Sequence, residues 1–288
     1  SPAFAMRQLA IGLSNKLVKQ QACSQLHLFG YLAFITYTLL VGILLAALLF
    51  IAPDDVWTEG ILLYFSLGYQ ASARQIKQIQ TCIKHQQKSA ARSLLAKSSE
   101  YDTDRLSVLG INKLSIETTT DKFVSEWLMP VVLFLVLGGV ASLLFRALVE
   151  ANKAWQPKND RYQAFGRASR QIKSLLELVP TWLIAPVYSV FKSSPGWLTM
   201  VRRAKQAWRS SAIGSFNQLI WISIVSAGCK SELAGPVILE GNKLRRPRLN
   251  KGLPVDELAI GQVLNWNDRF RFFVIVLLLL LTFLLGIK

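Results

Sequence analysis

The sequence predicts an all-α, polytopic helical membrane protein with amphipathic helices and loops on the cytoplasmic side. Hydrophobic residues make up 52% of the 288 residues, and the mean hydropathy is +0.34. Most of this excess lies in three uncharged stretches, 28–52, 127–145 and 272–287. Because a helix rises about 1.5 Å per residue, the first can cross the roughly 30 Å hydrocarbon core of a bilayer, and the second nearly can.

Positive charge is unevenly distributed along the chain. The formal net charge is +16, from 33 Lys and Arg against 17 Asp and Glu. Basic residues gather in 71–113, 151–173 and 243–251, whereas the short turn 53–59 has acids and no base. The positive-inside rule therefore places the basic segments in the cytoplasm and the acidic turn outside. Since acidic lipid headgroups attract the same basic surface, membrane lipids are expected partners and nucleic acid is not.

The first membrane segment is expected near 28–52, and a shorter, partly apolar return segment near 60–72. The first is not a cleaved signal peptide, because it follows a basic lead, is too long for a signal h-region and lacks a small-x-small exit. The sequence starts at Ser1 rather than methionine, so we expect some upstream chain to be missing. Apolar residues at helical spacing then predict amphipathic cytoplasmic helices within 73–126.

The next apolar segment, 127–149, raises a question of topology. A single crossing would place the basic stretch 151–173 outside, against the charge rule. Gly138 and Gly139 lie in the middle of the segment. Two half-helices that turn at these glycines would form a re-entrant hairpin and return the chain to the cytoplasmic face. The alternative is a plain spanning helix with a packing face of small residues.

The rest of the chain is predicted to be cytoplasmic helices and loops at 150–217 and 230–268, followed by a last membrane segment near 270–287. Pro180 and Pro186 break or kink the helices in which they lie. Residues 233–254 form a loop rich in glycine, proline and arginine. With no repeats and no long linkers, we expect a single polytopic membrane domain over 1–288.

Two carboxylates stand one helical turn apart just before the 127–149 segment, in the sequence "SIETTTDKFVSEW". If this stretch is helical, Glu117 and Asp121 share one face and could serve a cation or a phosphate site. The alternative for Asp121 is helix capping, because Thr118 and Asp121 have the spacing of a capping box ahead of an apolar helix.

Several further motifs follow in order: "AARSLLAKSSEYDTDRLSVLGI", "ETTTD", "LGGVASLLFRAL", "RYQAFGRAS" and "ELAGPVILEGNKLRRPRLN". In order, spacing and membrane context, they resemble the CobD/CbiB membrane proteins of cobalamin biosynthesis along almost the whole chain. The resemblance implies an adenosylcobinamide-phosphate synthase activity. In this reaction ATP-dependent amide ligation joins aminopropanol, or its phosphate, to adenosylcobyric acid. It also implies a multi-pass protein of the bacterial inner membrane that takes a corrinoid substrate.

The resemblance also suggests roles for individual residues. ATP and Mg²⁺ are the implied cofactors, and magnesium bound to a triphosphate needs only one or two protein carboxylates, a role that Glu117 and Asp121 could fill. These two are also the candidate catalytic residues. Arginine and lysine side chains would meet the phosphate charge. The candidate substrate- and phosphate-binding residues are Arg92, Arg146, Lys158, Arg161, Tyr162, Gly235, Arg245, Arg246 and Arg248.

This chain departs from the family pattern at several polar positions. Where the pattern has "ENTxDG" followed by alanine and proline, Thr118 replaces the asparagine, Lys122 the glycine and Glu126 the proline. Tyr101 replaces the arginine of "RDT", and Glu150 lies where the pattern has "NTLD". Either the active site has been rebuilt or catalysis has been lost. The alternative functions are therefore a catalytically degenerate relative with an AmpE-like signalling role, or a membrane scaffold for other cobamide-assembly proteins.

Overall fold

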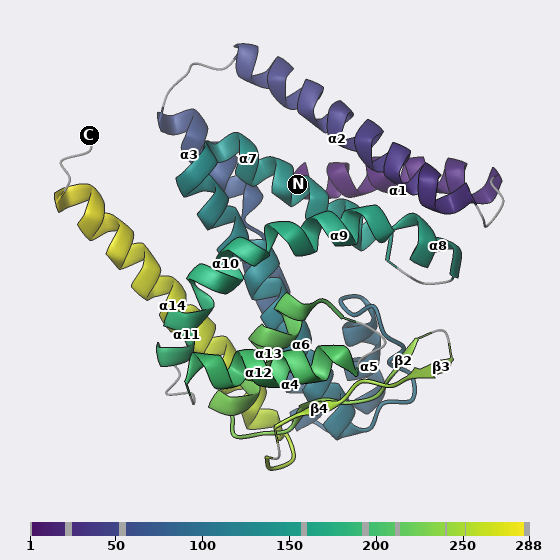
Figure 1. Cartoon of the computed structure of the whole chain (residues 1–288), viewed down its shortest axis with the longest axis vertical. Coiled ribbons are helices and arrows are strands. Elements are labelled where there is room, and N and C mark those ends of the chain that lie inside the picture. Colours follow the sequence, from purple (N-terminus) through teal and green to yellow (C-terminus); the bar gives the residue numbers. More distant parts are fainter. Residues whose placement is uncertain are drawn as a thin grey trace. The chain divides into compact units, whose positions relative to one another are not determined.

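The structure is a computed structural model that describes residues 2–20, 25–51, 56–156, 160–191, 196–210, 214–239, 241–250 and 252–284. It is predominantly helical, as the sequence predicts (Figure 1). Two compact units are built from interleaved segments. The first comprises Ser1–Ala71, Lys122–Pro180 and Leu239–Asn242, and the second comprises Ser72–Asp121, Thr181–Ile238 and Lys243–Lys288. The expectation of one domain over the whole chain stays a prediction.

The first unit contains the helices that begin the chain and those that follow residue 122. They are α1 (Pro2–Gln20), α2 (Leu26–Ile51), α3 (Val56–Ser66), the π-helical turn η2 (Val124–Leu128), α7 (Met129–Ala154), α8 (Asp160–Phe165) and α9 (Arg167–Leu176). Its core forms around Trp155, whose ring packs edge-on against Tyr37 and Phe165. The Trp155 indole N–H donates to the carbonyl of Ala10 at 2.9 Å, which joins α1 to the end of α7.

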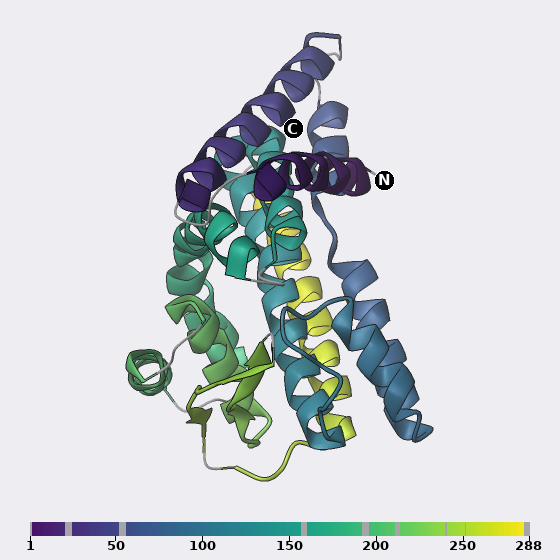
Figure 2. The ribbon, with the colours of Figure 1, turned by 90° about the vertical axis from the view of Figure 1, so that its right-hand side faces the viewer.

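Helix α7 reverses direction at Gly138, whose backbone is non-helical with φ 82° and ψ −178°. The Ser142 hydroxyl donates to the carbonyl of Pro130 at 3.0 Å. In a straight helix these two residues would be about 18 Å apart along the axis, so the two halves of α7 must lie against each other. The Gly139 N–H at the restart donates to the Glu59 carboxylate of α3, and α3 lies beside α7 (Figures 1 and 2).

The turn at the glycine pair is therefore present, and the alternative of an unbroken helix through 127–149 is wrong. Two described helical stretches, Leu26–Phe50 and Val108–Ala154, are long and apolar enough to cross a membrane. The number rises to three if the pair Arg167–Leu183 and Ala185–Phe191, bent by 50°, is one span. The expected segments near 60–72 and 270–287 fall on α3 and on α14, and their insertion stays a prediction.

The second unit holds most of the amphipathic helices. They are α4 (Tyr69–Lys84), α5 (Lys88–Ala96), α6 (Val108–Phe123), α10 (Leu178–Leu183), α11 (Ala185–Phe191), α12 (Trp197–Arg209), α13 (Phe216–Gly228) and α14 (Glu257–Leu284). α4, α6 and α10 start or end in the first unit. Tyr188 anchors the core of the second unit, because its hydroxyl donates to Asn267 at 2.6 Å and its ring packs edge-on against Trp221 and Phe270.

Short strands occur in the segment that the sequence predicts to be a loop. They are β1 (Leu233–Ala234), β2 (Val237–Leu239), β3 (Asn242–Leu244) and β4 (Arg248–Leu249). β1 pairs with β4 in antiparallel register, Leu233 with Leu249, and β2 pairs with β3. The β1–β4 pair packs against α12 and α13 (Figure 1). It thereby fixes the loop that follows β1 in front of α6, which is where the first candidate site lies.

Candidate functional site

Glu117 of α6 is buried in the second unit, and both of its carboxylate oxygens accept hydrogen bonds. Oε1 accepts from the Ala234 N–H at 2.9 Å, and Oε2 accepts from Nη2 of Arg246 at 2.5 Å. The Arg246 Nε donates to the carbonyl of Gly235 at 3.2 Å. The side chains of Glu117 and Arg246 are only 4% and 3% exposed, so this is a buried ion pair. It clamps the loop after β1 onto α6.

The clamped loop has an unusual backbone. Ala234 has φ 59° and Gly235 has φ 111°, both in the region of positive φ that residues other than glycine rarely adopt. A non-glycine residue persists there only when its surroundings hold it. The hydrogen bond from the Ala234 N–H to Glu117 supplies that restraint.

Tyr101 completes this cluster, which we call the Glu117 cluster (Glu117, Arg246, Tyr101, Ala234 and Gly235). The guanidinium carbon of Arg246 lies 5.7 Å from the centre of the Tyr101 ring. Burial raises the pKa of Tyr101 to about 12, together with the charges of Glu100, Glu117 and Asp121, while Arg246 acts to lower it. Burial, the largest single effect, acts to lower the pKa of Arg246, but the charge and hydrogen bond of Glu117 together with Tyr101 outweigh it and raise the pKa, so the guanidinium stays charged.

A second cluster lies in the first unit, where salt bridges join five side chains in alternating sign. Lys122 pairs with Glu126 at 3.5 Å, and Glu126 pairs with Lys153 at 2.6 Å. Lys153 also pairs with Glu150 at 2.8 Å, and Glu150 pairs with Nη2 of Arg146 at 2.7 Å. Because Glu126 precedes the turn in α7 and Lys153 follows it, the hairpin itself assembles this group. We call it the Arg146 cluster.

Most of the chain matches a known protein family. The family model described as "CobD/Cbib protein" matches residues 2–266. The chain belongs to the CobD/CbiB family. Three relatives named "Cobalamin biosynthesis protein CobD" come from Stutzerimonas stutzeri, Chromobacterium violaceum and Listeria monocytogenes. They are 27%, 24% and 23% identical, over 73%, 72% and 83% of this chain and 68%, 65% and 78% of their own lengths. No solved structure matches the chain.

The structure brings some of the predicted site residues together. Arg246 contacts both Glu117 and Gly235. Asp121 lies one turn further along α6, and its charge helps to raise the pKa of Tyr101. The capping interpretation of Thr118 and Asp121 is wrong, because α6 begins at Val108 and both residues lie in its interior.

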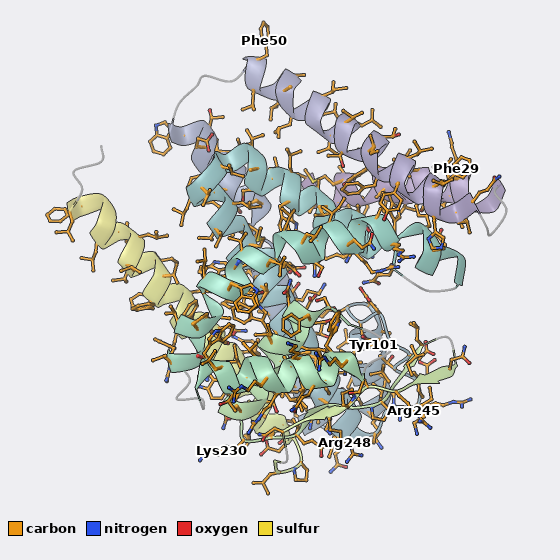
Figure 3. The ribbon with its side chains drawn as sticks, viewed as in Figure 1. Phe29, Phe50, Tyr101, Lys230, Arg245 and Arg248 are labelled. Carbon is orange, nitrogen blue, oxygen red and sulfur yellow. The ribbon has the colours of Figure 1, made fainter. Side chains whose placement is uncertain are left out.

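Other predicted residues in the second unit lie outside the Glu117 cluster. Arg92 donates to the carbonyl of Leu106 from Nε at 3.0 Å and from Nη2 at 2.5 Å, which anchors the loop that carries Tyr101. Arg245 and Arg248 are exposed in the strand region (Figure 3). Arg248 pairs with Glu232, which also pairs with Lys113 at 2.6 Å. The hydrogen bond from Lys113 lowers the pKa of Glu232.

The predicted residues of the first unit are partly described. Arg146 belongs to its own cluster there. Tyr162 donates to Asn15 at 3.5 Å and packs against the core around Trp155, which is a packing role. Arg161 is in α8, but its side chain is outside the described part of the structure, and so is the whole of Lys158.

Sequence reasoning missed Lys153, and it noted Lys122, Glu126 and Glu150 only as departures from the family pattern. The spacings from Lys122 to Glu126 and from Arg146 to Glu150 are four residues, which was a readable sign of two helical ion pairs. The two ion pairs come together in one cluster only because the chain turns at Gly138. All three departures thus fall in one cluster.

The implied magnesium site does not fit Glu117. Within the described residues, no group of three or more His, Cys, Asp and Glu side chains could hold a metal ion. Both Glu117 oxygens already accept hydrogen bonds, one of them from a guanidinium. A divalent cation at Glu117 would stand beside the positive charge of Arg246, so these residues do not fit a magnesium ion there.

Proposed function

We propose that this chain is a bacterial inner-membrane enzyme of cobalamin biosynthesis. It ligates aminopropanol, or its phosphate, to adenosylcobyric acid and so forms adenosylcobinamide or its phosphate. The observation that supports this most strongly is the family match over residues 2–266, together with relatives that are named cobalamin biosynthesis proteins. The apolar helices of the first unit support a membrane location.

The proposed reaction sets clear chemical requirements. A carboxylate does not react with an amine until one of its oxygens can leave. ATP would supply this by transferring a phosphoryl group to that oxygen, with the remaining nucleotide as the leaving group. The amine nitrogen would then form the amide bond as the oxygen departs with the phosphate, and would lose a proton. The protein must hold phosphate charge, which arginine and lysine side chains do best. The exposed Arg245 and Arg248 in the second unit, and Arg146 in the first, are the candidates.

Within this proposal Glu117 acts as a positioning residue. Its two hydrogen bonds leave no oxygen without a donor, so it holds the loop at Gly235 and the charge of Arg246 in place rather than acting as a free base. Asp121 is the remaining carboxylate of the predicted pair, one helical turn away. We assign proton removal from the amine to Asp121, whose charge acts on Tyr101, and Tyr101 itself is kept neutral by burial.

A second candidate is a family member that has lost catalysis and serves in AmpE-like signalling or as a membrane scaffold for other cobamide-assembly proteins. The observation that favours it is the engagement of Glu117 by the chain itself, combined with the charged residues at Lys122, Glu126 and Glu150. A clamp that only stabilises the fold would have the same hydrogen bonds.

The deciding experiment is complementation. A bacterial strain that lacks its own CobD/CbiB protein is grown on adenosylcobyric acid, with this chain or with its Asp121→Asn variant. Ligase activity predicts growth with the parent chain and a loss of at least tenfold in cobinamide formation with the variant. Asp268→Asn, which alters the pair between Arg271 and the exposed Asp268 on α14 of the same unit, is the matched control. If the full-length parent protein reaches the membrane and does not support growth, the ligase is excluded and the second candidate stands.

A further inference from the structure

Arg146 is a buried cation whose hydrogen-bonding capacity is largely unused. Its side chain is 8% exposed, and only Nη2 has a partner, the Glu150 carboxylate. The Nε and Nη1 atoms are buried and have no hydrogen-bond partner. Buried polar groups in native proteins are nearly always satisfied, by protein, water or a bound ion. Two unsatisfied nitrogens on one guanidinium therefore indicate a group that the chain itself does not supply.

The surroundings of Arg146 are built to fit it closely. Its guanidinium lies against Gly68, between α3 and α4, where any Cβ atom would collide with Nη1 and the guanidinium carbon. The Gly68 N–H donates to the carbonyl of Glu126 at 3.0 Å, which ties this backbone to the same cluster. The side chain is thus held in one position by the chain around it.

The cluster also has an unbalanced charge. It contains the cations Lys122, Arg146 and Lys153 and the carboxylates Glu126 and Glu150, and so its net charge is +1. One small anion would balance it, whereas a nucleoside triphosphate would bring a large excess of negative charge. Arginine binds phosphate through two parallel hydrogen bonds, and nearby lysines add positive charge.

We propose that Arg146 binds a single phosphate group in the first unit, and that Glu150 is an internal competitor for it. Glu150 occupies Nη2 in the structure and lowers the positive charge that the ligand meets. This deepens the proposed function, on which it rests for calling the phosphate group part of a substrate. The phosphate group of a soluble ligand and that of a phospholipid headgroup share this chemistry.

Binding is tested on the full chain, purified in detergent from which phospholipid has been removed. Its thermal unfolding is followed by tryptophan fluorescence at increasing inorganic phosphate, with ionic strength held constant by sodium chloride. A ligand that binds only the folded state raises Tm in proportion to its affinity. We expect phosphate to raise Tm in the parent. Arg146→Lys, which keeps the charge but removes the planar donors, should weaken the apparent affinity at least tenfold.

Glu150→Gln gives the sharper result, because it should strengthen binding. The change frees Nη2 and raises the net charge of the cluster, so we expect an affinity about tenfold higher. Glu177→Gln is the matched control, since Glu177 is another buried carboxylate of the first unit, paired with Lys173 at 3.0 Å. It should leave phosphate affinity within twofold of the parent.

The outcomes separate cleanly. A Tm rise with inorganic phosphate identifies a soluble ligand. A rise only on adding phosphatidylglycerol, lost in Arg146→Lys, identifies a lipid headgroup. No rise with either probe, or the same rise in the parent and Arg146→Lys, overturns the phosphate site and leaves buried water as the partner of Arg146. Equal effects of Glu150→Gln and Glu177→Gln overturn the competition. If the chain binds phosphate but fails the complementation test, the phosphate site stands and the proposed ligase activity is excluded.

Discussion

At the residue scale, the ion pair between Glu117 and Arg246 has the strongest energetic consequences. Taking two charges out of water is costly, and only their mutual attraction and their extra hydrogen bonds offset that cost. Here the extra bonds go to the Ala234 N–H and the Gly235 carbonyl, so the pair also fixes a backbone with positive φ. Removing one partner leaves the other charge buried and unpaired.

We therefore expect Glu117→Gln to destabilise the protein by roughly 3–5 kcal/mol, because it leaves the Arg246 charge buried without a counter-ion. The free energy of unfolding in mixed detergent micelles, measured by denaturant titration, checks this value. Glu232→Gln is the control, because its partners Lys113 and Arg248 are more exposed, and it should cost less than about 1 kcal/mol. Equal losses in the two variants would show that the Glu117 pair is not a buried clamp.

The sequence could predict half of this pair. The spacing of Glu117 and Asp121 predicts one helical face, and both residues are indeed in α6. The partner Arg246 is 129 residues away, in a stretch where several basic side chains look equivalent. Only the pairing of β1 with β4 decides that Arg246 turns inward while Arg245 and Arg248 stay exposed. Such long-range choices follow from tertiary packing and leave no periodic signal.

At the scale of elements, the hairpin in α7 shows what a glycine pair can and cannot predict. Two adjacent glycines in an apolar segment predict a break, because only glycine readily adopts positive φ. The charge rule adds the direction of the return. Neither predicts the cap at the turn, where Glu59 of α3 accepts from the Gly139 N–H, because that contact joins residues 80 apart in sequence. From the sequence, Glu59 is predicted only to lie in an acidic external turn.

Substitutions at the turn should separate backbone from packing effects. Gly138→Ala places a side chain at φ 82°, a conformation that costs of order 1–3 kcal/mol. At Gly139 an added Cβ would lie 2.7 Å from Glu59 Oε2 and 2.8 Å from Leu62 Cβ, so Gly139→Ala must also displace α3. We expect both to destabilise the protein, with Gly139→Ala further weakening the contact between α3 and α7. Thermal unfolding in detergent measures the loss.

Gly42→Ala provides the comparison for these two variants. Gly42 is in α2, and an added Cβ there would meet nothing within 4 Å. Alanine is the better helix former, so this change should be neutral or stabilise by about 0.5–1 kcal/mol. If Gly138→Ala behaves like Gly42→Ala, the chain does not turn at Gly138.

At the scale of the whole molecule, the exposed apolar side chains indicate whether lipid or water surrounds the protein. Large side chains of α2, α3 and the hairpin tip are open: Phe50 (Figure 3) is 93% exposed, Ile61 54% and Val136 70%. Exposed apolar surface of this kind is unfavourable in water and typical of contact with lipid. The two stretches that flank Gly138 from Lys122 to Ala154 are each about 24 Å long, less than the roughly 30 Å hydrocarbon core. This length favours a re-entrant hairpin over two complete crossings.

The hairpin makes a definite topological prediction. Because Lys153 pairs with Glu126, the chain leaves the hairpin on the side where it entered. Lys88 precedes the hairpin and Arg167 follows it, and both are exposed. In a background with Cys23, Cys82 and Cys229 replaced by serine, we expect Lys88→Cys and Arg167→Cys to react with an impermeant maleimide only after the inner membrane is opened. Trp57→Cys should react in intact spheroplasts, since the charge rule places the turn after α2 outside.

An unbroken crossing gives the opposite pattern for one of the two cytoplasmic probes. Lys88→Cys and Arg167→Cys would then be labelled from opposite faces of the membrane, whatever the orientation of the whole chain. That result would also remove the basic segment 151–173 from the cytoplasm, where the positive-inside rule requires it. Protection of both Lys88→Cys and Arg167→Cys, with Trp57→Cys labelled, therefore tests the hairpin and the orientation together. An unbroken crossing would expose one of the two cytoplasmic cysteines, and an inverted chain would protect Trp57→Cys.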